Sequence, residues 1–146
     1  MIRAAIVDRE IDTGALISEV KSDGAGAVSV FIGTVRDVSD GRGVIGLEYE
    51  AYRAMAESEL VAILDEAAAK FEIASLVAEH RIGELGIGDV SVAIAASHAH
   101  RTPAIECAQF VIEEIKKRVP IWKREHFVDG TREWVDPTAR TEARAP

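Results

Sequence analysis

The chain has 146 residues, 48% of them hydrophobic, and a formal net charge of −8. This size and apolar content fit one domain with its own core, and the acidic balance argues against a nucleic-acid partner, because nucleic-acid-binding domains usually carry a basic surplus. We find neither an apolar run long enough to cross a membrane nor a signal peptide, and the single cysteine, Cys107, excludes an internal disulfide, so we expect a cytoplasmic protein.

Apolar residues recur along the chain with two different periods, which predicts both strands and helices and therefore an α+β or mixed α/β fold. Short or alternating apolar runs predict strands at 4–7, 26–36, 47–52, 76–82, 89–97, 121–127 and 132–135. Stripes at helical spacing predict a helix capped by Asp12, a second over 53–72 and a third from Thr102 to just before Pro120. The strand at 26–36 is almost entirely small or β-branched, which is typical of a central strand.

Glycine-containing segments are expected to connect these elements. Residues 38–43 predict a polar loop, and the three glycines between residues 83 and 88 predict a turn or a bulge. A phosphate-binding glycine loop would need a helix after it, and a strand follows instead, which disfavours that alternative. We expect residues 1–135 to form a single domain and 136–146, which have almost no apolar bulk, to form a flexible tail.

The last predicted helix has an apolar stripe that would face the core. Its members are Ala104, Ile105, Ala108, Val111, Ile112 and Ile115. Cys107 lies on the same side of the helix and is therefore expected to be a core thiol, not an exposed sulfur donor.

Cations gather between Lys116 and Arg124, where five of nine residues are Lys or Arg and none is acidic. The stretch from His100 to Arg132 has a net charge of +2, so the rest of the chain has a net charge of −10. A local cationic cluster on an acidic protein predicts a site for a small anion and not for a polyanion.

Lys116 and Lys123 are the main candidates for chemistry. Because Pro120 lies between them, Lys116 belongs to the last helical turn and Lys123 to the extended segment that follows. One interpretation is that both are solvated lysines near the negative end of a helix. The alternative is that Trp122 desolvates Lys123 and lowers its pKa towards neutrality, as an acid–base or nucleophilic lysine requires. Their spacing leaves both interpretations open.

Histidines cluster just before the last helix. His100 and Arg101 would sit at its start, where free backbone N–H groups and the positive end of the helix favour a phosphate. The competing interpretation is a metal site in which His98 and His100 are joined by His80 and His126. No nearby cysteine or His-Glu-x-x-His helix supports a metal, and we expect none.

Charged residues on the first half of the chain give weaker signals. Arg36 ends a predicted strand after Gly33, where ligands often gather, but taken alone it would be a surface charge. Glu48 and Glu50 alternate with aromatic residues and are expected to face water.

Three segments together resemble a known family. They are 31–36 (Phe-Ile-Gly-Thr-Val-Arg), His100-Arg101 before a helix, and Lys116 and Lys123 within Lys-Lys-Arg-Val-Pro-Ile-Trp-Lys-Arg-Glu. The chain resembles the large, catalytic subunits of molybdopterin synthase, the MoaE type. The segments 48–52 and 79–83 also match, and the likeness extends from about Ile2 to Val135.

This resemblance implies a fold, a reaction and partners. The fold would be an α/β hammerhead with an additional small β-containing subdomain. The reaction would be sulfur transfer to cyclic pyranopterin monophosphate, which makes the dithiolene of molybdopterin in molybdenum cofactor biosynthesis. The sulfur would arrive as a thiocarboxylate on the C-terminal Gly-Gly tail of a small ubiquitin-like subunit, so this chain would need no cofactor of its own. Two copies would form the homodimeric core of a heterotetramer, with each active site borrowing residues across the dimer interface.

The resemblance also assigns site residues. Lys116 and Lys123 would be the catalytic pair. Lys123 would be the acid–base group or, alternatively, hold a transient covalent species, and Lys116 would orient the thiocarboxylate and stabilise an oxyanion. The substrate-binding residues would be Thr34, Val35, Arg36, His100, Arg101, Arg124 and Glu125 beside the two lysines, with Phe31 lining the pocket. Two rivals remain: a non-catalytic module that binds a phosphorylated metabolite or a ubiquitin-like tail, and a histidine-based metalloenzyme.

Overall fold

The computed structural model describes residues 1–135, so the tail predicted at 136–146 lies outside the described residues. The helices are α1 (Thr13–Val20), α2 (Arg53–Phe71) and α3 (Arg101–Arg118). The strands are β1 (Ile2–Val7), β2 (Ala27–Thr34), β3 (Val38–Ser39), β4 (Arg42–Ala51), β5 (Ser75–Arg81), β6 (Gly83–Gly86), β7 (Val90–His98), β8 (Ile121–Phe127) and β9 (Arg132–Val135). The predicted α+β class is confirmed. No helix in residues 1–135 is long and apolar enough to span a membrane.

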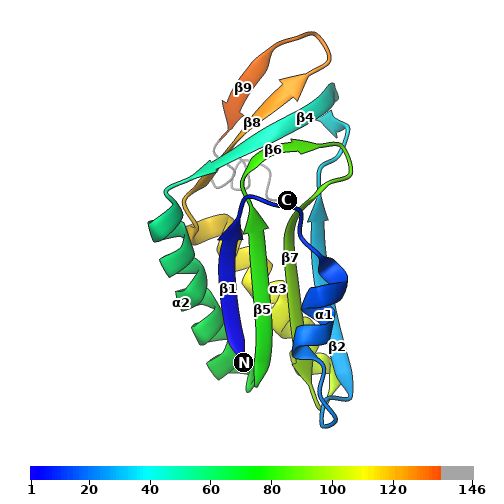
Figure 1. The fold of residues 1–146 in the computed structure, drawn as a ribbon, viewed down its shortest axis with the longest axis vertical. Coiled ribbons are helices and arrows are strands. Elements are labelled where there is room, and N and C mark those ends of the chain that lie inside the picture. Colours follow the sequence, from blue (N-terminus) through cyan, green and yellow to red (C-terminus); the bar gives the residue numbers. More distant parts are fainter. Residues whose placement is uncertain (136–146) are drawn as a thin grey trace.

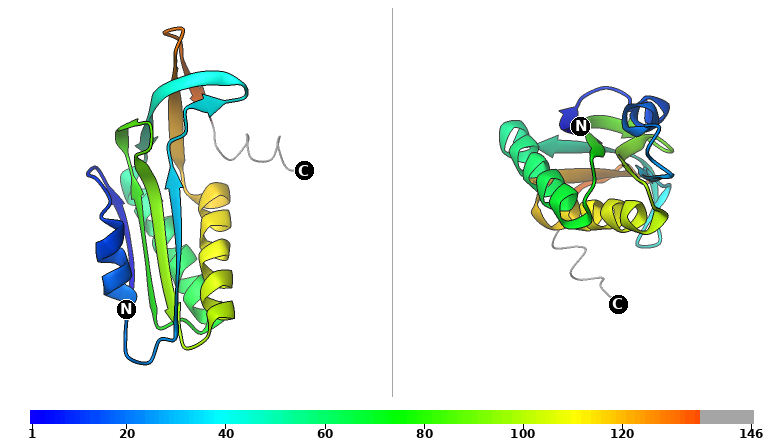
Figure 2. Two further views of the ribbon diagram at one scale, coloured as in Figure 1. Left: turned by 90° about the vertical axis from the view of Figure 1, so that its right-hand side faces the viewer. Right: turned by 90° about the horizontal axis from the view of Figure 1, so that it is seen from below.

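A four-stranded sheet forms the middle of the molecule. Its order is β1-β5-β7-β2, with β1 parallel to β5 and the other neighbours antiparallel. Helices α2 and α3 cover one face and the short helix α1 covers the other, which gives three layers (Figures 1 and 2). The main core lies between the sheet and α2 with α3, where Leu60, Ile63, Leu64 and Val111 are fully buried.

A second sheet extends beyond one end of the first (Figure 1). Strand β4 is its centre: it pairs with β3, with β6 and with β8, and β8 pairs in turn with β9. Strands β4 and β8 lead directly into α2 and out of α3, respectively. The second sheet is therefore joined to the helical layer through the start of α2 and the end of α3.

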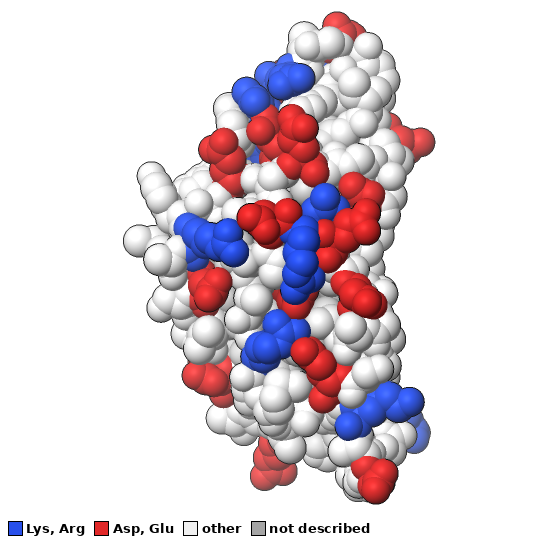
Figure 3. Space-filling model, in the orientation of Figure 1, with Lys and Arg blue, Asp and Glu red and all other residues white. Residues whose placement is uncertain are grey.

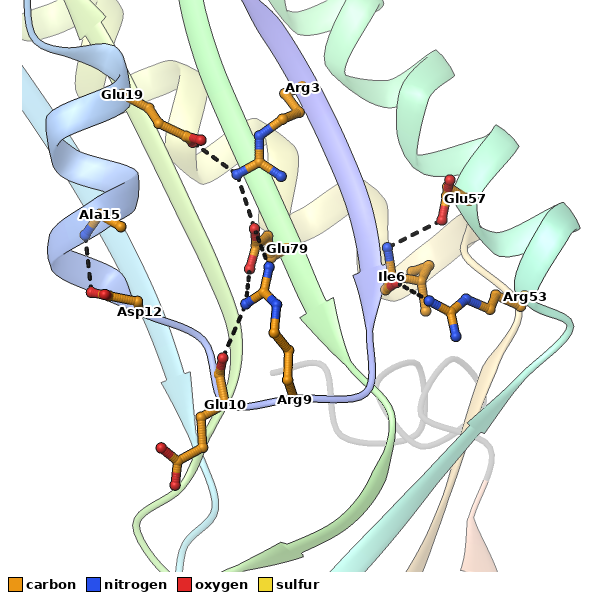
Figure 4. Close-up of polar contacts among 10 residues, drawn as sticks. All are labelled: Arg3, Ile6, Arg9, Glu10, Asp12, Ala15, Glu19, Arg53, Glu57 and Glu79. Atoms are coloured by element: carbon orange, nitrogen blue, oxygen red, sulfur yellow. Dashed lines mark hydrogen bonds and ion pairs between the residues drawn. The ribbon is translucent and has the colours of Figure 1, made fainter.

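Polar contacts fasten the N-terminal segment to the outer face of the first sheet (Figure 4). Glu79 of β5 is only 2% exposed and accepts hydrogen bonds from Arg3 at 2.9 Å and from both terminal nitrogens of Arg9 at 3.2 Å. Asp12 accepts a hydrogen bond from the backbone N–H of Ala15 at 3.0 Å, which confirms the predicted N-cap of α1. These contacts hold β5 in place. The residue after Glu79 faces the opposite layer, because side chains alternate along a strand.

The structure corrects several predictions about individual elements. Strand β2 lies at an edge of its sheet and not at the centre, and it pairs only with β7 among the described residues. Its β-branched composition indicates a strand but not a place in the sheet order, which long-range pairing decides. The expected loop at 38–43 is a tight hairpin between β3 and β4, with Asp40 and Gly41 at positive φ. The expected turn at 83–88 contains strand β6.

Two side chains also differ from expectation. Glu48 does not face water, because it forms ion pairs with Arg124 and His126 across β4 and β8. Ile105, expected on the buried stripe, is 54% exposed, whereas Cys107 is fully buried, which confirms the predicted core thiol. A stripe drawn at a spacing of three to four residues leaves the edge of the buried face uncertain by one position, which is the error made at Ile105.

Candidate functional site

A cavity of about 240 Å³ opens where the end of α3 meets both sheets. Its walls come from β2, β4, β5, β7, α3 and β8, so it lies at the junction of the two sheets and not on either one. The lining residues are Phe31, Gly33, Thr34, Arg36, Tyr49, His80, Ser91, Val92, Ile112, Ile115, Lys116, Val119, Ile121 and Lys123.

Three cations from separate elements converge on this cavity: Arg36, Lys116 and Lys123. Pro120 makes the convergence of the lysines possible, because Val119 before it adopts extended angles (φ −79°, ψ 125°) and ends α3. The chain then turns into β8, which returns Lys123 to the same cavity. Arg36 follows β2, whose end is held by hydrogen bonds between Val35 and the 86–89 turn, at 3.0 Å to Asp89 and 2.7 Å to Gly88.

Lys116 has a perturbed ammonium group. The residue keeps a large exposed area, as expected for a side chain that opens into a cavity, but the surrounding protein desolvates its charge. This desolvation lowers the pKa of Lys116, and the nearby Arg36 guanidinium lowers it further. The sequence pointed to Lys123 for such a shift, whereas the structure provides the two physical causes at Lys116.

Two polar but uncharged rings line the cavity beside these cations. His80 is 7% exposed, and burial lowers its pKa to about 4, with a smaller contribution from the Lys116 charge and opposition from a hydrogen bond to the Arg81 carbonyl. Tyr49 packs edge-on against the His80 ring with centroids 5.0 Å apart. Burial raises the pKa of Tyr49, whose phenol is hydrogen-bonded to Ser91. At neutral pH, both rings are therefore uncharged.

A smaller recess of about 60 Å³ adjoins the cavity and shares Thr34, Arg36, Tyr49 and Lys123 with it. Glu125 lines this recess and is only 2% exposed. Its carboxylate lies 3.6 Å from the Lys123 ammonium on the same face of β8. A carboxyl group and a lysine at this separation could transfer a proton to or from a ligand that binds between them.

The two neighbours of Lys123 face away from the cavity. Trp122 packs edge-on against Tyr52 with centroids 5.1 Å apart, so the prediction that Trp122 desolvates Lys123 is wrong. Adjacent residues of a strand point to opposite faces, which is the physical reason. Arg124, also on that opposite face, pairs with Glu48 and lies over the Trp134 ring at 5.0 Å. Of the predicted substrate-binding residues, Arg124 therefore lies outside the cavity and its recess.

His100 and Arg101 also lie outside the cavity of their own chain. His100 is the N-cap of α3 and Arg101 its first residue, whereas the cavity is lined by the last turns of the helix. Fifteen residues of α-helix separate Arg101 from Lys116, a distance of about 22 Å. The remaining predicted residues, Phe31, Thr34, Val35 and Glu125, line the cavity or its recess.

The cationic segment of the sequence divides into two groups in the structure. Lys117 pairs with Glu114, and Arg118 pairs with Glu59, Glu66 and Glu114. Arg118 joins α3 to α2 in this way, whereas the Lys117 pair lies within α3, and neither cation lines the cavity. On the face drawn in Figure 3, cations likewise lie among acids and form no broad basic field. The site for an anion therefore consists of three converging cations and not of a basic surface.

The sequence analysis missed His80, Tyr49 and Ser91 as cavity residues. The signal available for His80 was the alternation of β5, which places it and Glu79 on opposite faces, but the sequence does not reveal which face meets α3. The four histidines do not gather, and no group of three His, Cys, Asp or Glu residues within 1–135 could hold a metal ion. Cys107 is buried, and its burial raises the pKa of its thiol to about 11.

Comparison with known proteins agrees with this geometry. Residues 6–118 match the family model described as MoaE protein. The chain is 43% identical to the molybdopterin synthase catalytic subunit of Bacillus subtilis over 143 residues, covering 98% of this chain and 90% of that one. It is also 43% identical to that of Thermoplasma volcanium over 129 residues, covering 88% and 94%.

Solved structures give the same result. The crystal structure of molybdopterin synthase from Staphylococcus aureus superposes with a TM-score of 0.85 at 40% identity, covering 90% of this chain and 95% of that one. A complex of subunits 1 and 2 of the molybdopterin-converting factor from Helicobacter pylori superposes with a TM-score of 0.74 at 26% identity, covering 90% and 89%. With a family model matched over most of its length and relatives above 40% identity, the chain belongs to the MoaE family.

Proposed function

We propose that this chain is the catalytic subunit of a molybdopterin synthase, a sulfurtransferase that acts in the cytoplasm. It would transfer sulfur from the C-terminal thiocarboxylate of a small ubiquitin-like subunit to cyclic pyranopterin monophosphate. The observation that carries the proposal is the convergence of Arg36, Lys116 and Lys123 on one cavity of an otherwise acidic protein. The names of the relatives support it independently.

The proposed roles follow from chemistry and position. Arg36 offers a planar fork of donors, which suits the phosphate of the substrate. Lys123 is the acid–base group, because it lies beside Glu125 and lines both the cavity and the recess. Lys116 orients the thiocarboxylate and stabilises the oxyanion that develops there. Phe31, Thr34 and Val35 line the walls of this site. The sulfur is brought by the partner, so neither a metal nor an exposed cysteine is required of this chain.

A second copy of the chain would complete the site. His100 and Arg101 lie about 22 Å of helix away from Lys116 in their own chain, too far to contact the same small ligand. We propose that they reach the cavity of the other subunit in a homodimer, where they hold the phosphate and the pterin. The small subunit binds at each cavity of this dimer, and the Helicobacter pylori complex of two subunits supports such a partner.

Turnover by lysine variants tests the proposal. The chain is mixed with cyclic pyranopterin monophosphate and a thiocarboxylated small subunit, and molybdopterin is measured through its fluorescent oxidation product. We expect turnover by the wild type and a loss of about 10²- to 10⁴-fold in Lys123→Ala, the usual contribution of a general acid–base. Lys116→Ala is expected to lose activity as well. Lys21→Ala, at the far end of α1, is the matched control and should remain fully active.

Two outcomes would contradict the proposal. Full activity in both Lys116→Ala and Lys123→Ala would remove the lysines from the mechanism. Binding of both ligands by the wild type without any product would indicate a non-catalytic module. Dialysis against a chelator checks the remaining rival, because a histidine-based metalloenzyme would lose activity and the proposed enzyme would not.

A further inference from the structure

His80 presents one ring nitrogen to the cavity in a fixed protonation state. Its Nδ1 lies 2.9 Å from the carbonyl oxygen of Arg81, and a carbonyl oxygen can only accept a hydrogen bond. Nδ1 must therefore carry the proton. Because burial keeps the imidazole neutral at ordinary pH, Nε2 carries a lone pair.

Within residues 1–135 the hydrogen-bond geometry pairs His80 through Nδ1 alone, and Nε2 is not among the solvent-inaccessible atoms without a partner, so its lone pair is open to the cavity. The side chain is more than nine-tenths buried, and it forms part of the cavity wall. An acceptor on a cavity wall is hydrogen-bonded to water when the cavity is empty, and a ligand that displaces this water needs a donor at the same place to keep the hydrogen bond.

The other polar groups of the cavity make this acceptor distinctive. The side chains of Arg36, Lys116 and Lys123 only donate when charged, so they bind the acceptor atoms of a ligand. Ser91 donates to the Gly33 carbonyl at 3.2 Å and is also hydrogen-bonded to Tyr49. Among the described side chains that line the cavity, Nε2 of His80 is thus the group restricted to accepting.

We infer that His80 is a specificity-determining residue, whose Nε2 accepts a hydrogen bond from an N–H or O–H of the ligand while the three cations bind its anionic part. This inference rests on the proposed function, because the pterin ring of the proposed substrate carries N–H donors next to a cyclic phosphate. It selects ligands that combine an anion with a neighbouring donor and disfavours simple phosphate esters. The rival interpretation is a histidine that only packs against Tyr49 and fills the wall.

Nitrogen NMR on ¹⁵N-histidine-labelled protein tests the hydrogen bond directly. A neutral imidazole nitrogen that begins to accept a hydrogen bond moves upfield, and the His80 resonances are assigned by their loss in His80→Gln. Adding cyclic pyranopterin monophosphate without the sulfur donor should move Nε2 and leave Nδ1 in place. Methyl phosphate at pH 8, a dianion without a donor, should leave Nε2 where it was.

Two substitutions separate the acceptor from the packing. His80→Asn keeps an N–H that can reach the Arg81 carbonyl but removes the acceptor, whereas His80→Gln can place an amide oxygen near the position of Nε2. We expect calorimetric Kd values for cyclic pyranopterin monophosphate to rise about tenfold to a hundredfold in His80→Asn and to recover in part in His80→Gln. Binding of methyl phosphate should be equal in both. His126→Asn, a histidine of β8 outside the cavity, is the control.

The possible failures are distinguishable. Nε2 that stays in place while the wild type binds and converts the substrate would overturn the role of His80 and leave the proposed function intact. Equal weakening of both ligands in His80→Asn and His80→Gln would assign the residue to packing. No binding of cyclic pyranopterin monophosphate by the wild type would overturn the proposed function and this inference together.

Discussion

The role of a single residue in this protein depends more on its immediate neighbours than on its own residue type. Lys116 and Lys117 are adjacent in sequence, yet one lines the cavity beside Arg36 and the other pairs with Glu114 on the surface. The pKa of Lys116 is lowered by desolvation and, to a smaller extent, by the charge of Arg36, a residue distant in sequence. A lysine needs these neighbours before it can serve at an active site.

The pKa of Lys116 should therefore respond to Arg36. Removing the guanidinium in Arg36→Met takes away a like charge, so the pKa of Lys116 should rise and its ammonium should persist to higher pH. The pKa should stay below that of an ordinary lysine, because desolvation, the larger cause, remains. Titration of ¹³C-labelled lysine side chains by NMR measures this shift.

Arg132→Met is the matched control for this titration, because Arg132 lies on β9 outside the cavity. It should leave the Lys116 titration unchanged. An equal pKa in wild type and Arg36→Met would mean that the two cations do not sense one another.

At the scale of elements, pairing between distant strands determines the features that local apolar patterns cannot predict. The stripes of α2 and α3 and the stop at Pro120 could be predicted, since helical spacing and proline act locally. The edge position of β2 and the orientation of Lys123 and Trp122 could not, because they depend on pairing with β7 and β4. The convergence of Lys116 and Lys123 agrees with the sequence, whereas Arg124 of the same segment lies outside the cavity, and His80 and Tyr49 reach it only through long-range packing.

The connection between α1 and β2 offers a test of such long-range contact. A Cβ added at Gly26 would lie 2.4 Å from the backbone carbonyl oxygen of Ala99, which precedes α3 and cannot turn aside as a flexible side chain could. We expect Gly26→Ala to lower the free energy of unfolding by about 1–3 kcal/mol through this overlap. Urea denaturation followed by circular dichroism gives the value.

Gly24→Ala is a close control, because an added Cβ there would meet nothing within 4 Å. Its stability should be unchanged or slightly raised, since alanine restricts the unfolded chain. Equal stability of the two variants would show that the backbone near Ala99 moves aside at little cost.

At the scale of the whole molecule, the cavity exists because two sheets and a helix end meet. The first sheet supplies His80 and Ser91, the second supplies Tyr49 and Lys123, and α3 supplies Lys116. Lys116 and Lys123 keep their separation only while β8 leaves α3 in a fixed direction. That direction is set at Val119–Pro120, where the N–H of Ile121 also bonds to the Val119 carbonyl at 2.8 Å.

Loosening this connection should impair catalysis more than folding. Pro120→Gly frees both Val119 and the substituted position, which adds entropy to the unfolded chain and mobility between the lysines. We expect the Tm to fall by only about 3–8 °C, whereas kcat/KM should fall about tenfold, because misplacement of a reacting group by a fraction of an ångström is costly. Pro120→Ala, which restores part of the restriction, should lie between wild type and Pro120→Gly in kcat/KM. The assays are run well below the Tm of both variants, where each is fully folded. If kcat/KM then equals that of the wild type, Pro120 contributes stability and does not set the distance between the lysines.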